Sequence, residues 1–192
     1  MVTDYKLILA SNSPRRRELL AGLDVDFDVF VLDGIDESYP QDLKSTDVAL
    51  YIARKKAEPY KQIIAPDALV ITADTVVVVD NRILGKPHDE AEAMEMLREI
   101  SGRTHLVITG VCLTTQEKQV SFSVETEVTF KSLSDAEIEH YVTKYKPYDK
   151  AGAYGIQEWI GYVGVTSLKG SYYNVMGLPV QRIYEELKSI IP

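Results

Sequence analysis

Short apolar runs alternate along the chain with longer segments whose apolar residues recur at helical spacing. The apolar runs predict strands at residues 5–10, 25–32, 69–79, 105–115, 120–130 and 162–168. The helical spacing predicts helices at residues 15–22, 46–64, 89–100, 134–145 and 178–190. Because strands and helices are mixed along the chain rather than segregated, the pattern predicts an α/β fold with a mixed sheet.

Residues at the ends of two predicted helices carry capping signals. Ser13 is placed as an N-cap, Pro14 at the first helical position and Gly22 just past the end of the first helix. Ser134 and Glu137 have the spacing of a capping box. These signals favour the predicted helix starts.

Composition limits the class of protein. The 192 residues suit a single domain over residues 1–192, or two lobes around a shared core, and 45% hydrophobic residues suffice for a core. The formal net charge of -8 argues against a nucleic-acid partner, because such proteins usually carry a basic face. The single cysteine, Cys112, lies in an apolar run and predicts a core position. We find neither a signal peptide nor an apolar run long enough to span a bilayer, so we expect a cytoplasmic protein with no membrane partner.

The segment from Ser11 to Arg17 is the first candidate site. It follows a predicted strand and opens a helix, and this geometry presents backbone N–H groups and a positive helix end to anions. Ser11 and Ser13 add hydroxyl donors, and Arg15 and Arg16 add guanidinium donors that suit phosphate. Cations in a first helical turn are unfavourable, so three arginines in succession indicate a bound anion. The alternative is a solvated basic turn with an ordinary serine cap.

Asp74 interrupts a long β-branched run and is the second candidate. An unpaired carboxylate in such a run would be costly to bury, so it pairs with a cation, binds a metal or lies at a strand end. Glu37, in an acidic loop, could join Asp74 in an oxygen-ligand site for Mg²⁺. The alternatives are a bulge or a water-facing strand end for Asp74 and a solvated loop for Glu37.

Three lysines, Lys56, Lys86 and Lys150, lie in segments rich in small residues, glycine or proline, although any one of them taken alone reads as a solvated surface lysine. Other chemistry is not indicated. The chain lacks a phosphate-binding Gly-x-x-x-x-Gly-Lys-Ser/Thr motif, a strand-linked Gly-x-Gly-x-x-Gly motif and zinc-ligand spacing.

Together these segments resemble the Maf family of nucleotide pyrophosphatases. The resemblance extends in the family's order from residue 9 to residue 179. It rests on Leu9-Ala10-Ser11-x-Ser13-Pro14-Arg15-Arg16, Asp36-Glu37, Lys56-Ala57, Ala73-Asp74-Thr75-Val76, Gly85-Lys86-Pro87, Ser101-Gly102-x-Thr104-His105, Asp149 to Gln157, Gly170 to Val175 and Gly177-Leu178-Pro179. One departure is Lys146 before Pro147, where relatives often have an acidic residue, and this leaves the local loop shape open.

The resemblance implies hydrolysis of a nucleoside triphosphate to the monophosphate and pyrophosphate, as house-cleaning of nucleotide pools. It also implies a divalent cation (Mg²⁺ or Mn²⁺), a cytoplasmic homodimer, and a mixed, twisted sheet flanked by helices with two lobes around a deep cleft, as in the inosine-triphosphatase-like fold. The family's proton acceptor falls on Asp74, and its base-selecting positions fall on Arg15, Thr75 and Gln157. These three residues match the dTTP/UTP branch rather than the 7-methyl-GTP branch, which tends to have Trp, Gln and Glu there.

The resulting hypothesis gives each candidate a role. The triphosphate would be held by Ser11, Ser13, Arg16, Lys56 and Lys86, with Lys150 as a further cleft residue. Glu37 and Asp74 would hold the metal, and Asp74 would activate the attacking water. Two alternatives remain open: a phosphatase that releases inorganic phosphate, and a non-catalytic nucleotide-binding regulator of septum formation and cell division.

Overall fold

The computed structural model describes residues 5–190 and divides them into two compact units. The first unit comprises residues 5–74, 109–124 and 177–190, and the second comprises residues 75–108 and 125–176. Three long strands, β3 (Ala68–Val79), β5 (Thr104–Thr114) and β6 (Gln119–Phe130), each contribute residues to both units.

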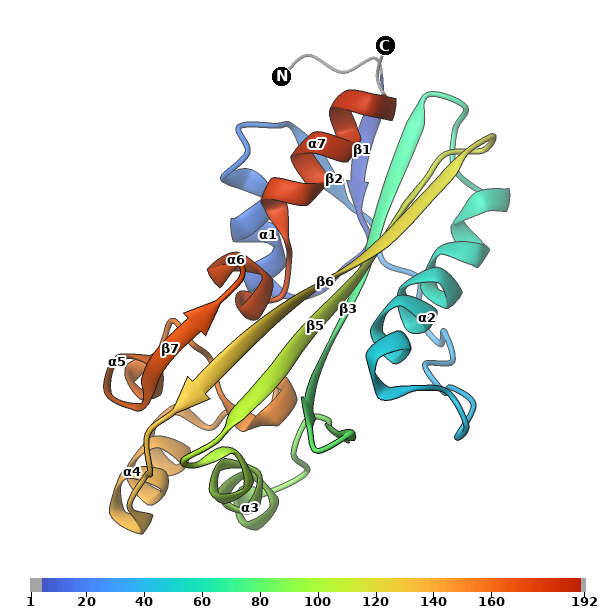
Figure 1. Ribbon diagram of the computed structural model, residues 1–192. Helices are drawn as coiled ribbons and strands as arrows, with labels where there is room; N and C mark the ends of the chain where they lie inside the picture. The colour runs from blue at the N-terminus through green and yellow to red at the C-terminus, as the bar shows by residue number, and fades with distance from the viewer. Residues whose placement is uncertain (1–4, 191–192) are drawn as a thin grey trace. The chain divides into compact units, whose positions relative to one another are not determined.

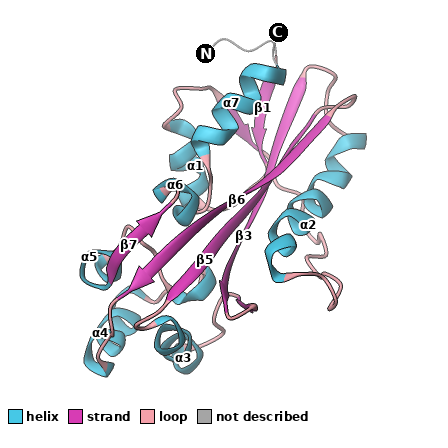
Figure 2. Ribbon diagram, in the orientation of Figure 1, coloured by secondary structure: helices cyan, strands magenta, loops and turns pink. Residues whose placement is uncertain are grey.

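Within residues 5–190, seven strands form one sheet in the order β2-β1-β3-β5-β6-β7, with β4 paired to β3 off this path. The short strands are β1 (Lys6–Leu9), β2 (Phe27–Val29), β4 (Arg82–Leu84) and β7 (Val165–Lys169). β1 pairs in parallel with β2 and β3, whereas β3 pairs with β4 in the antiparallel sense. β6 and β7 are also antiparallel, and their arrows point in opposite directions in Figure 2. The predicted mixed sheet of an α/β fold is confirmed.

Helices cover the sheet of the first unit. Figure 1 shows α2 (Ser45–Ala57) on one side of the sheet, and α1 (Pro14–Ala21) with α7 (Val180–Ile190) on the other. Contact between α2 and β5 is very close, because a Cβ at Gly110 would lie 2.4 Å from backbone atoms of Ala49 and Leu50. A larger residue at this glycine would therefore push the helix off the sheet.

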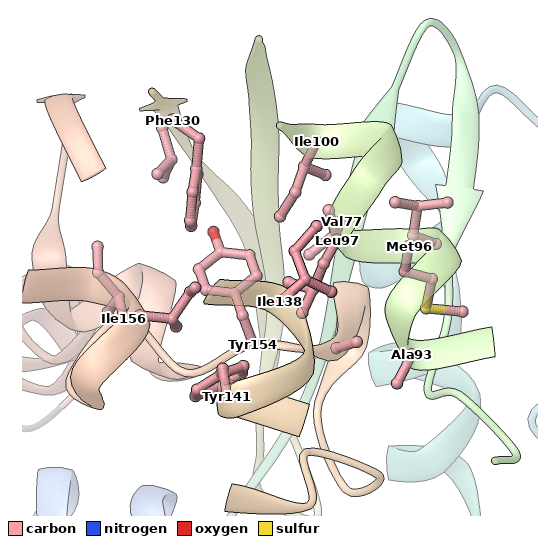
Figure 3. Close-up of a cluster of buried hydrophobic side chains, with 14 of the residues drawn as sticks. Val77, Ala93, Met96, Leu97, Ile100, Phe130, Ile138, Tyr141, Tyr154 and Ile156 are labelled. Atoms are coloured by element: carbon pink, nitrogen blue, oxygen red, sulfur yellow. The ribbon is translucent and has the colours of Figure 1, made fainter. Parts of the chain in front are cut away.

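The second unit is built around one apolar cluster. It gathers residues from α3 (Glu90–Ile100), α4 (Asp135–Tyr145) and the adjoining parts of β3, β5 and β6. Figure 3 shows aromatic members of this cluster, including Phe130, Tyr141 and Tyr154, beside aliphatic side chains from α3 and α4. The predicted capping box of α4 is present, with Ser134 and Glu137 bonded to each other's backbone N–H. This core supports the loop that follows α4.

Three elements differ from the predictions. The predicted helix at 46–64 ends at Ala57 and continues as a 3₁₀ turn, η1 (Glu58–Gln62), because Pro59 has no N–H to extend an α-helix. The predicted strand at 25–32 is paired only over Phe27–Val29. The first residues of the predicted strand at 162–168 are helical instead, in α5 (Trp159–Gly164).

The error at α5 has a local cause. A Cβ at Gly161 would lie 1.8 Å from the carbonyl oxygen of Ile156, and the N–H of Gly161 donates to Glu158 O at 2.9 Å. The chain therefore turns tightly at this glycine before β7 begins. Two short helical segments, η2 (Ala151–Ala153) and α6 (Tyr172–Met176), complete the second unit. Over residues 5–190, each helix is too short or too polar to cross a membrane.

Candidate functional site

The turn between β1 and α1 holds its two serine hydroxyls in place. Ser11 Oγ accepts a hydrogen bond from Ser13 N at 3.2 Å, and Ser13 Oγ accepts one from Arg16 N at 3.4 Å. Ser13 is thereby confirmed as the N-cap, and Pro14 as the first residue of α1. Both hydroxyl groups can still donate, so this helix start keeps the anion-binding geometry expected from the sequence.

Arg16 is anchored inside the first unit. Its Nε donates to Gly177 O and its Nη1 donates to Ala73 O, both at 2.8 Å. Burial lowers the pKa of Arg16, and the nearby carboxylate of Asp74 opposes that shift. The three successive arginines therefore do not all require an external anion, because Arg16 already has internal partners. Its predicted phosphate contact stays a prediction.

Asp74 forms an ion pair with Lys56. The side chains are 16% and 15% exposed, and Lys56 Nζ lies 2.9 Å from Asp74 Oδ1. Asp74 lies inside the continuous strand β3, where it and Thr75 are the two half-buried positions in an otherwise buried strand. Of the alternatives drawn from the sequence, pairing with a cation is confirmed, and a strand end is wrong.

Lys56 also reaches Glu37. Its Nζ lies 3.1 Å from Glu37 Oε1, so one ammonium group faces two carboxylates from distant parts of the sequence. The neighbouring Lys55 fixes the loop that carries Glu37, because its Nζ donates to Asp36 Oδ2 at 2.6 Å and to Ser38 O at 2.9 Å. The hydrogen bond from Lys55 holds the pKa of Asp36 well below its usual value. Glu37 and Asp74 therefore contact the same ammonium group, and their predicted role as metal ligands stays a prediction.

Glu37 and Asp74 can serve as ligands of a hard cation. Their two oxygens already converge on one positive group, the Lys56 ammonium. In residues 5–190 there is no group of three or more His, Cys, Asp or Glu side chains that could hold a metal. A cation bound here would take its other ligands from water and phosphate oxygens, which is the habit of Mg²⁺.

In the second unit, Lys150 is buried, unlike a typical surface lysine. Its side chain is 10% exposed, and its Nζ lies 3.0 Å from Asp149 Oδ1 and 3.1 Å from Glu158 Oε1. The alternative that Lys150 is a solvated surface lysine is therefore wrong. Two carboxylates provide the compensation that a buried ammonium group needs.

Gln157 carries a buried acceptor. Its Oε1 has no hydrogen-bond partner among the described residues, although its atom is shielded from solvent. A buried amide oxygen without a partner is costly, and a ligand that donates a hydrogen bond would relieve this cost. Gln157 is therefore suited to accept a hydrogen bond from a ligand.

The remaining predicted residues occupy separate places. Lys86 is exposed in the loop after β4, and the adjacent Gly85 O accepts a hydrogen bond from Gly152 N at 3.0 Å. Arg15, at the start of α1, and Thr75, in β3, are half-buried. The structure thus brings Glu37, Lys56 and Asp74 together with Arg16 beside them, and it ties the loop of Lys86 to the segment that begins at Lys150.

Two residues were not predicted as part of the site. Glu158 pairs with Lys150 and accepts a hydrogen bond from the hydroxyl of Tyr141. Tyr141 in turn accepts one from Gly155 N at 3.0 Å. The one general signal available for them is that a buried tyrosine hydroxyl usually needs a partner.

Comparisons with known proteins identify the family of this chain. A dTTP/UTP pyrophosphatase of Phocaeicola vulgatus is 60% identical over 97% of this chain and 96% of its own length. A dTTP/UTP pyrophosphatase of Parabacteroides distasonis is 60% identical over 96% of this chain and 95% of its own. The Ham1 protein of Staphylococcus aureus shares the fold, with a TM-score of 0.57 at 14% identity over 96% of this chain and 99% of its own. The family described as Maf-like protein matches residues 6–190. The chain belongs to the Maf family, as its motifs predicted.

Proposed function

We propose that this protein hydrolyses dTTP and UTP to the monophosphate and pyrophosphate. The observation that carries the proposal is the carboxylate of Asp74, set in a buried strand and held 2.9 Å from Lys56 Nζ, which also contacts Glu37. A carboxylate fixed by a cation keeps one orientation, as a proton acceptor for water requires. The relatives of similar sequence named dTTP/UTP pyrophosphatase support this substrate class.

The first unit would hold the phosphates. The backbone at the start of α1, with the hydroxyls of Ser11 and Ser13, offers donors to a phosphate group. Lys56 adds a positive charge, and Arg16 lies beside Asp74. Lys86, an exposed residue of the second unit, is the remaining phosphate-binding residue that the family resemblance implies. Phosphoryl chemistry depends mainly on this positioning and charge neutralisation.

A divalent cation, Mg²⁺ or Mn²⁺, would be held by Glu37 and Asp74. When bound, it would neutralise phosphate charge and polarise the phosphorus centre. Asp74 would orient the attacking water and accept its proton, and pyrophosphate would be the leaving group.

Gln157 would select the base. Its amide offers one acceptor and one donor pair, which match the N3–H and O4 of uracil and thymine but not the corresponding edge of cytosine. The buried Oε1 without a partner among the described residues supports this role, since N3–H would donate to it. Arg15 and Thr75, the other two base-selecting positions of the dTTP/UTP branch, would complete the selection.

The test is a panel of dTTP, UTP, CTP, GTP and modified pyrimidine triphosphates with Mg²⁺ or Mn²⁺, in which pyrophosphate and inorganic phosphate are measured separately. We expect pyrophosphate from dTTP and UTP, no activity after chelation, and weaker use of UTP relative to GTP in Gln157→Glu. Release of inorganic phosphate would instead identify a phosphatase. Nucleotide binding without either product would favour a non-catalytic regulator of cell division.

A further inference from the structure

Glu158 uses both of its carboxylate oxygens inside the second unit. Oε1 lies 3.1 Å from Lys150 Nζ, and the other oxygen accepts a hydrogen bond from the hydroxyl of Tyr141. The side chains of Lys150 and Glu158 are only 10% and 21% exposed. An ion pair so shielded from water is weakened little by salt and fixes its partners more firmly than a surface pair does. Glu158 therefore joins the start of the loop that follows α4 to α4 itself.

Tyr141 connects this ion pair to the middle of the same loop. The side chain is fully buried within the apolar cluster of Figure 3, and its oxygen accepts a hydrogen bond from Gly155 N at 3.0 Å. Burial and the hydrogen bond with Glu158 raise the pKa of Tyr141 far above its ordinary value, so the hydroxyl stays protonated and donates to Glu158. The bonds run in series from Gly155 through Tyr141 and Glu158 to Lys150.

The amide of Gln157 lies over the backbone that these bonds hold. A Cβ at Gly155 would lie 3.0 Å from Lys150 Cε and 3.2 Å from both Nε2 and Oε1 of Gln157. The stem of Lys150 and the amide of Gln157 therefore lie close to the same glycine. A shift of either Lys150 or Gly155 would change the space left for the amide.

From these contacts we infer that Glu158 is a positioning residue for base selection. It holds Lys150 directly and Gly155 through Tyr141, so that Gln157 presents its amide in one orientation. This inference rests on the proposed role of Gln157 as the base reader. Glu158 itself does not touch the base, and it acts only through the residues that it holds.

Glu158→Gln tests the inference with the least change in volume. The new amide can still accept a hydrogen bond from Tyr141, but it has no charge for Lys150. Because small misplacements of a positioning group carry large kinetic costs, kcat/KM for UTP should fall about ten- to hundredfold. The UTP-to-CTP ratio of kcat/KM should fall as well, and Glu158→Asp should restore part of it.

A matched control uses a surface pair of the same length. Glu127 Oε1 lies 3.1 Å from Lys169 Nζ, with both side chains well exposed, so Glu127→Gln should keep the wild-type UTP-to-CTP ratio. Tyr141→Phe supplies a readout that needs no activity. It should speed hydrogen exchange at the Gly155 amide, which loses its acceptor, and it should lower the same UTP-to-CTP ratio.

The outcomes separate the inference from the proposed function. A wild-type UTP-to-CTP ratio in Glu158→Gln, where Gln157→Glu lowers that ratio, would overturn the positioning role of Glu158. A ratio that is unchanged in Gln157→Glu as well would place the failure in the proposed role of Gln157. If Glu158→Gln does not fold, the ratio in Tyr141→Phe decides, because this variant breaks the same series of bonds at another point.

Discussion

Lys56 Nζ lies 2.9 Å from Asp74 Oδ1, and this single contact makes a carboxylate tolerable in the middle of the buried strand β3. The same ammonium lies 3.1 Å from Glu37 Oε1, so the pair belongs to a set of three charges with one cation at its centre. Lys56 compensates the charge of Asp74 in the folded protein, and Asp74 is the proposed proton acceptor. Separate mutations can test the effect of the ion pair on stability and the role of Asp74 in turnover.

Asp74→Asn should lower kcat by at least about 10²-fold, the scale of losing a general base. The amide oxygen can still accept a hydrogen bond from Lys56, so the strand should remain intact. Pyrophosphate release under saturating UTP measures the effect. Asp67→Asn, which changes an exposed carboxylate 2.9 Å from Lys6 Nζ, is the control and should turn over normally. Near wild-type turnover in Asp74→Asn would remove Asp74 from the chemistry.

Lys56→Met should reduce the free energy of unfolding by about 1–3 kcal/mol, because it leaves a mostly buried carboxylate without its charged donor. The combination with Asp74→Asn should recover part of this loss, since a neutral amide needs no counter-ion. Urea denaturation of the single and double variants measures both effects. Lys6→Met breaks an ion pair of the same length at the surface and should change little. Additive losses in the double variant would contradict the coupling.

Gly110→Ala should destabilise the first unit by about 3 kcal/mol, the upper range of ordinary overpacking. The new methyl group would lie 2.4 Å from backbone atoms of Ala49 and Leu50, which cannot rotate away. Gly85→Ala is the matched control, because a Cβ there would meet no atom within 4 Å. Chemical denaturation compares the two, and equal stabilities would show that α2 can move off β5 at little cost.

His105 should make stability depend on pH. Its pKa is lowered to about 4 by burial, beside Tyr154 whose hydroxyl oxygen lies 2.6 Å from Nε2. Between that value and the ordinary histidine pKa of about 6.5, the unfolded chain binds the extra proton. The free energy of unfolding should therefore rise with pH across this range, by about 3 kcal/mol in total, and become flat above it.

His105→Gln removes this titration and isolates it from the acidic groups. The difference in unfolding free energy between wild type and variant, measured by urea denaturation from pH 4 to pH 7, should grow toward neutral pH. A difference that does not vary with pH would mean that His105 has the same pKa in the folded and the unfolded protein.

Local features were predictable from the sequence because their causes are local. Ser13 caps α1 through its own near neighbours, and Asp74 needed a partner wherever it folded. The limits of prediction are seen at Arg16, which donates to Gly177 O from 161 positions away. A pattern that describes one helix turn contains nothing about so distant a carbonyl.

The role of Glu158 also could not be predicted from a local sequence pattern. A glutamate just after a glycine-rich loop looks like any solvated acidic residue, and its importance comes from a lysine eight positions earlier and a tyrosine on the preceding helix. The first residues of the strand predicted at 162–168 are helical for a related reason, because the carbonyl of Ile156 approaches Gly161 only in the folded turn. Tertiary contact outweighed local propensity in both places.

Lys56, which contacts the carboxylates of both Glu37 and Asp74, affects the protein even when no nucleotide is bound. A newly made chain carries its own counter-ion for the carboxylate in β3, supplied by a side chain 18 positions earlier. Folding and the stability of the folded protein should therefore not depend on divalent cations. A chelator added to the purified protein should leave its melting temperature unchanged.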